Sequence, residues 1–191
     1  MSGGSYTLRW DVEYHITPQS LRQLVAQSDL VIVGDVMENR CHLSKTGNYI
    51  TTDYKVSVHE RLRGAIEAGL PSVLVSIVGG KVLFEDGLTA TVETPGFDRP
   101  VNGERLLLFL KLVPDAADYV APATRQYANG APVYRLVFGR ASLWGISANE
   151  NDRVTPKWQK PQNGALDYSG HRVETLLDDV RTVMNDLLRR R

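Results

Sequence analysis

The sequence has little of several features that would define a function at once. A single cysteine, Cys41, cannot form an internal disulfide. Lys plus Arg and Asp plus Glu are equal, at 22 each, so net charge gives no drive toward nucleic acid or an anionic membrane. The longest apolar run, residues 106–110, has the length of a strand and not of a membrane span. These absences predict an ordinary soluble chain of 191 residues, one domain with appendages.

Catalytic and metal-binding motifs are also missing. No G-x-S-x-G motif occurs, and Gly79-Gly80-Lys81 lacks the glycine spacing that cradles phosphate. None of the histidines stands in metal-ligand spacing, and we expect exposed loop or strand positions for His15, His42, His59 and His171. We therefore predict no catalytic residues, no cofactor and no metal site. A site assembled from distant residues stays open as an alternative.

Strand patterns dominate the middle of the chain. Residues 30–36 form a nearly continuous β-branched block, which predicts a buried strand. Residues 50–62 alternate, with one apolar face and one face that carries Asp53, Lys55, Ser57, His59 and Arg61. Asp86-Gly87 predicts a tight hairpin. The other predicted strands are 73–78, 105–110, 133–138 and 141–146, the last two forming a hairpin around Gly139-Arg140.

Helical patterns lie near the two ends. Thr17-Pro18 predicts the start of a short helix, because threonine caps free amides and proline suits the first turn; the helix ends by Asp29. Apolar residues recur at helical spacing over 173–188, which predicts an amphipathic helix followed by a basic end. Many strands with helices mainly at the ends favour a closed or half-open antiparallel barrel.

A family resemblance accompanies these patterns. The motifs SDLVIVGDV at 28–36, YKVSVHERLRG at 54–64 and VNGERLLLFL at 101–110 resemble a bacterial β-barrel domain that is often exported. That domain is similar to the OB-like (oligonucleotide/oligosaccharide-binding-like) barrels of netrin modules and tissue inhibitors of metalloproteinases. The resemblance implies the fold alone, because the N-terminal zinc-clamping cysteine of those inhibitors is absent and Cys41 has no partner cysteine.

The predicted fold is therefore mainly β, an antiparallel OB-like β-barrel with a short N-terminal helix and a C-terminal amphipathic helix. We divide the chain into a leader or extended arm (1–16), the barrel domain (17–148), an irregular tether (149–169) and a helix packed on the barrel (170–191). The first five residues are typical of an engineered or flexible leader. We expect an extracytoplasmic location, periplasmic or secreted, with a native export signal removed upstream; the cytoplasm is the alternative.

The residues favour a non-enzymatic binding or protein-interaction module. Residues 113–132 form a long excursion between strands, and the side chains there that are typical of interfaces are the candidate partner contacts Tyr119, Arg125 and Tyr127. Nucleic acid is an unlikely partner for this charge pattern, since acids interleave the basic strand residues. Two alternatives are a nucleic-acid-binding barrel and a hydrolase whose site gathers distant residues.

Overall fold

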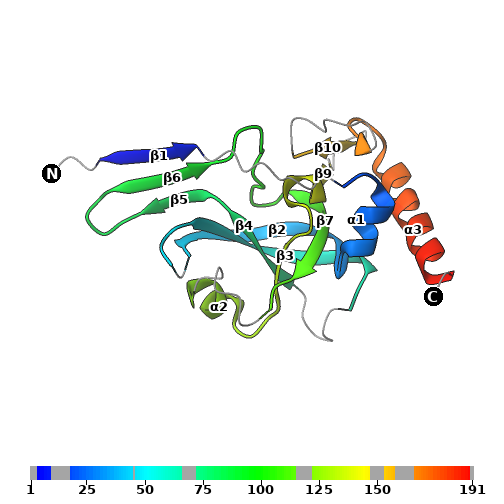
Figure 1. The fold of residues 1–191 in the computed structure, drawn as a ribbon, viewed down its shortest axis with the longest axis horizontal. Helices are drawn as coiled ribbons and strands as arrows, with labels where there is room; N and C mark the ends of the chain where they lie inside the picture. The colour runs from blue at the N-terminus through cyan, green and yellow to red at the C-terminus, as the bar shows by residue number, and fades with distance from the viewer. Residues whose placement is uncertain are drawn as a thin grey trace.

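The computed structural model describes residues 4–9, 18–44, 46–65, 72–114, 122–146, 153–157 and 166–189. The fold consists of a five-strand barrel with a small second sheet at one end and the helices α1 and α3 at the other (Figure 1). In chain order they are β1 (Ser5–Arg9), α1 (Leu21–Gln27), β2 (Leu30–Leu43), β3 (Ile50–Arg63), β4 (Ser72–Val78), β5 (Gly80–Leu83), β6 (Thr89–Glu93), β7 (Arg105–Leu112), α2 (Pro122–Ala128), β8 (Val133–Leu136), a 3-10 turn (Gly139–Ser142), β9 (Leu143–Ile146), β10 (Val154–Pro156) and α3 (Val173–Arg189).

The barrel is closed by the pairing of β7 with β8. Its strands lie in the order β7-β2-β3-β4-β8, and β8 pairs back onto β7, which leaves no open edge within the ring. The pair β4–β8 is parallel, and the other pairs of the ring are antiparallel. The predicted mainly β, OB-like barrel with a short N-terminal helix and a C-terminal helix is confirmed.

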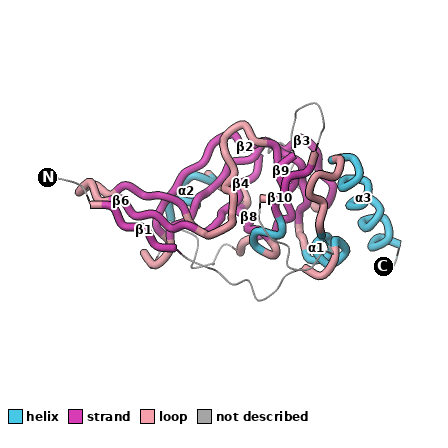
Figure 2. Tube along the Cα trace, turned by 90° about the horizontal axis from the view of Figure 1, so that it is seen from above, coloured by secondary structure: helices cyan, strands magenta, loops and turns pink. Residues whose placement is uncertain are grey.

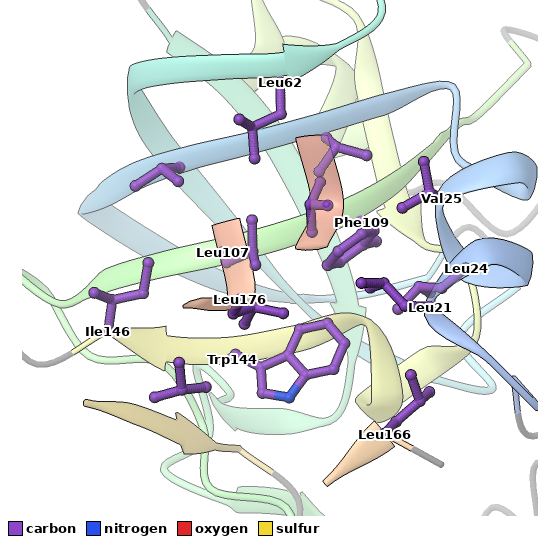
Figure 3. Packing of buried hydrophobic residues seen from close by; sticks show 14 of the residues in the cluster. Leu21, Leu24, Val25, Leu62, Leu107, Phe109, Trp144, Ile146, Leu166 and Leu176 are labelled. Atoms are coloured by element: carbon purple, nitrogen blue, oxygen red, sulfur yellow. The ribbon is translucent and has the colours of Figure 1, made fainter. Parts of the chain in front are cut away.

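Strands β2 and β7 each contain a continuous apolar run, because both faces of these runs are covered. Leu30 and Ile32 point into the barrel with Leu106, Leu108 and Leu110. Their neighbours Val31, Val33, Leu107 and Phe109 point outward into a second core, which α1 and α3 complete. Figure 3 shows this outer core, where Phe109 meets Trp144 edge-to-face at a ring separation of 5.2 Å. Continuous apolar runs at 30–33 and 106–110 follow from this double burial.

The N-terminal helix begins later than Thr17-Pro18, so that predicted start is wrong. Helix α1 begins at Leu21, where the Ser20 hydroxyl accepts the Gln23 amide at 3.2 Å. The Gln23 side chain in turn accepts the Gln19 amide at 2.8 Å. This reciprocal pattern is close to a capping box, in which two free amides of the first turn are satisfied at once. The helix ends before Asp29, as predicted.

A second sheet, β1-β6-β5, extends from the barrel (Figures 1 and 2). The hairpin predicted at Asp86-Gly87 is confirmed, because β5 and β6 pair antiparallel across it. Strand β1 adds to β6 in parallel. The sheet is tied to the barrel at Gly80, which has a φ of +136° and lies so close to β2 and β3 that a Cβ there would overlap the Thr52 hydroxyl.

The hairpin predicted over 133–146 is wrong. Strands β8 and β9 do not pair with each other: β8 pairs with the second half of β7, and β9 with its first half. The predicted tether also contains a strand, because β10 pairs with β9. For β8 and β9, pairing with β7, an antiparallel neighbour far along the chain, replaces the expected local hairpin. A local pattern cannot report that competition.

Candidate functional site

Helix α2 lies within the long excursion between β7 and β8 and packs on the outside of the barrel. Its Tyr127 and Ala128 contact a small apolar cluster formed by Leu74, Val113 and Val133. The outer faces of β2 and β3 lie beside this cluster, and their register places Arg40 opposite Asp53 and His42 opposite Thr51. We call the region formed by Arg40, His42, Asp53, Thr124, Gln126 and Tyr127 the α2 site.

Three of these side chains join α2 to the barrel. The Nε2 atom of His42 lies 2.5 Å from Oδ2 of Asp53 and 2.9 Å from the Thr124 hydroxyl. Asp53 and Thr124 have no solvent exposure. The expected exposed position for His42 and the expected polar strand face for Asp53 are therefore corrected: α2 covers both, which the alternation of β3 alone could not indicate.

Two further side chains stack at the edge of the site. The guanidinium carbon of Arg40 lies 4.3 Å from the centre of the Tyr127 ring, within the range of a cation–π contact. Together with His42, Ala123 and Gln126 they line an open pocket of about 410 Å³. No carboxylate is among these lining residues.

Some buried oxygens of this region lack hydrogen bonds. Among the described residues, Thr51 Oγ1, Asp53 Oδ1 and the Tyr127 hydroxyl are buried without a partner. Burial and then the nearby Glu38 carboxylate raise the pKa of Tyr127 to about 12. The Tyr127 hydroxyl therefore keeps its proton at neutral pH, and the Glu38 carboxylate is the nearby acceptor that favours this protonated form.

The arrangement does not form a nucleophilic relay. In such a relay the carboxylate and the nucleophile bind different nitrogens of the imidazole ring. Here the oxygens of Asp53 and Thr124 share Nε2, and Thr124 is closed off from solvent. The geometry fits an anchor between a helix and a sheet.

The three predicted contact residues have different positions. Tyr119 lies outside the described residues. Arg125 is on α2, where its guanidinium donates to the Pro114 carbonyl at 3.3 Å. Tyr127 lies in the α2 site, facing the barrel. Sequence reasoning missed Arg40, His42, Asp53 and Thr124; the polar residues at every second position of 38–42 were the available signal.

A second polar cluster lies on the barrel at β2, β3 and β7. Asp35 accepts two bonds from Arg105, at 2.8 and 3.1 Å, and lies 2.6 Å from His59. The Arg105 bonds, with help from His59, lower the pKa of Asp35 despite partial burial. Glu60 instead contacts Arg181 of α3 at 2.7 Å. His59 and Glu60 thus serve separate contacts.

No protein-family model matches the chain, and no curated protein matches it significantly. Within the described ranges, no group of three His, Cys, Asp or Glu side chains is placed to hold a metal ion. No helix in those ranges is long and apolar enough to cross a membrane.

Proposed function

We propose that this protein is a binding or protein-interaction module without catalytic activity, and that the α2 site is its recognition surface. One observation carries the proposal. Thr124, His42 and Asp53 hold α2 on the barrel, whereas the pocket beside them has polar groups without hydrogen bonds to the described residues. Binding residues collect on loops that a rigid scaffold holds in place.

The position of α2 supports this proposal by analogy. Five-stranded OB barrels commonly bind ligands with the loops after their first and fourth strands. Helix α2 follows β7, which is the fourth barrel strand in chain order. The analogy concerns the place of binding and not the ligand.

The family resemblance extends the proposal to origin and location. We place the chain with bacterial, often exported relatives of netrin-like barrels, in the periplasm or outside the cell. Two residues of the first motif have structural roles that explain their part in the resemblance: Ser28 donates to the Leu24 carbonyl of α1, and Asp29 binds Lys111 at the end of β7. These roles belong to the barrel and carry no chemistry of their own.

A nucleic-acid-binding barrel is the second candidate, because Arg40 and Tyr127 are residue types that contact phosphates and bases. Two features disfavour it. Glu38 lies 3.7 Å from Arg40, and Arg40 covers a face of the Tyr127 ring on which a base would stack.

The test is a capture experiment with matched variants. Wild type, Gln126→Trp, and Arg135→Ala as a control would be immobilised and exposed to extract of the source cells. Residue 126 lines the pocket, where a tryptophan would fill the space without adding charge, while Arg135 is exposed on β8 and lies outside the pocket lining. We expect a protein that wild type and Arg135→Ala retain and Gln126→Trp loses, and that binds again when purified.

Two outcomes would overturn the proposal. One is the absence of any protein whose capture depends on residue 126, together with turnover of a small substrate. The other is a salt-dependent shift of labelled single-stranded DNA or RNA that Gln126→Trp weakens and Arg135→Ala does not. The fold of each variant is checked by its urea unfolding midpoint.

A further inference from the structure

We propose that the pocket of the α2 site binds an oxyanion, a carboxylate or phosphate group carried by the protein partner, with Arg40 as its anchoring residue. This rests on the proposed function, since it names the chemistry that the same surface recognises.

Arg40 is held in place without its donors being used. Its guanidinium stacks on Tyr127 and forms no hydrogen bond with any described residue. The nearest acid, Glu38, lies 3.7 Å away and also lies 3.6 Å from Lys55. A stacked guanidinium keeps its planar N–H fork free, and that fork matches a carboxylate or phosphate in bidentate geometry.

The neighbouring pocket groups suit the same ligand. In the described part of the chain, the side-chain amide of Gln126 has no hydrogen-bond partner, whereas the buried Tyr127 hydroxyl has the Glu38 carboxylate nearby. His42 lines the pocket too, with Nε2 committed to Asp53 and Thr124. Among the described residues, the pocket lining thus has several donors and no carboxylate.

At the accessible edge of the pocket, Arg40 and Lys55 stand beside a single described carboxylate, that of Glu38. Asp53 lies beneath the pocket with no exposure, and Glu38 lies between Arg40 and Lys55. Two cations beside one exposed carboxylate attract an anion more than a cation.

Titration by nuclear magnetic resonance tests the inference with acetate and inorganic phosphate as probes and chloride at equal ionic strength as the reference. We expect saturable shifts of the α2 and β2 amides with at least one of the two probes in wild type and in Arg135→Ala. Arg40→Ala should bind that probe about tenfold more weakly or worse, and Arg40→Lys should fall between, because lysine keeps the charge without the fork. Tyr127→Phe keeps the stacking ring and should retain the fold.

Two results would overturn the inference: shifts no larger than those of chloride, or saturable shifts that Arg40→Ala leaves unchanged. If they occur while capture still depends on residue 126, the proposed function stands and only the oxyanion chemistry fails.

A further arm identifies the source of the anion. Release of the captured protein by acetate or phosphate supports a protein-borne group. Binding of a single-stranded oligonucleotide with the same Arg40 dependence overturns the assignment to a protein partner.

Discussion

The carboxylate of Asp53 is fully buried, and Nε2 of His42 lies 2.5 Å from it. This pair holds together two strands and, through Thr124, a helix from a distant part of the chain. Its geometry leads to the first two predictions.

Removing His42 should destabilise the protein more than neutralising Asp53. In His42→Ala the buried carboxylate loses its hydrogen-bond partner inside the barrel wall, and leaving a buried charged group without its partner costs about 3 kcal/mol. Asp53→Asn removes the charge and keeps a carbonyl oxygen that can accept from His42, so it should cost about 1–2 kcal/mol. Urea unfolding gives both values, and the double variant should lose less than their sum. Equal losses in the two single variants would contradict this account of the pair.

Thr124→Val should loosen α2 without unfolding the barrel. The substitution keeps the shape of the side chain and removes its hydrogen bond to His42, at a cost of about 1 kcal/mol. Hydrogen exchange of the amides in 122–128 should quicken, while exchange within β2 and β7 stays unchanged. Uniform acceleration across the barrel would show that the bond supports the whole fold and not the helix.

Asp29 should contribute to stability in a pH-dependent way. Burial alone raises its pKa, but hydrogen bonds from Lys111 and the Leu112 amide, with the charges of Lys111 and Arg63, outweigh burial and lower it. Because the folded pKa lies below the ordinary value, this contribution is present above about pH 4 and is lost as pH falls through the lowered pKa. The free energy of unfolding of Asp29→Asn should fall less steeply between pH 5 and pH 2 than that of wild type. Parallel slopes would contradict the prediction.

Gly80→Ala should be more harmful than Gly103→Ala. Both glycines have positive φ, +136° and +84°, so alanine is strained at either position. At Gly103 nothing lies within 4 Å of an added Cβ, whereas at Gly80 that atom would overlap the Thr52 hydroxyl and lie 2.8 Å from Cys41 Sγ. We expect Gly80→Ala to cost about 1–3 kcal/mol more, measured by urea unfolding. Equal costs would mean that the second sheet shifts freely away from the barrel.

The positive charge of Lys157 should stabilise the fold at neutral pH. Burial lowers its pKa, but bonds to Asp98 (2.8 Å) and Glu104 (2.5 Å) outweigh burial and raise it overall. The contribution of the ion pair is then complete below the ordinary lysine pKa and is lost only as pH rises through the raised value. Lys157→Met should lower the free energy of unfolding by about 2 kcal/mol, because it leaves Glu104 without its partner. The loss should be similar at pH 6 and pH 8. Adding Glu104→Gln should recover part of the loss.

The strands with strong local patterns could be predicted from the sequence, and the pairings between distant strands could not. The apolar block from Leu30 and the alternation of 50–62 gave two correct strands, because burial leaves its period in the sequence. The hairpin at Gly139-Arg140 failed, because β7 pairs with both of its expected strands. His42 and Asp53 are covered only because α2 packs over them, with Thr124 lying 82 residues after His42. No local period records such a cover.

Strand β7 is shared by the barrel ring and by the β9–β10 extension, and its outer face supports both α1 and α3. The barrel ring and the β9–β10 extension therefore share the hydrogen bonds of β7, and neither can unfold while the other stays folded. Unfolding of this part should be a single cooperative event, with the amides of residues 106–110 as the last to exchange with solvent.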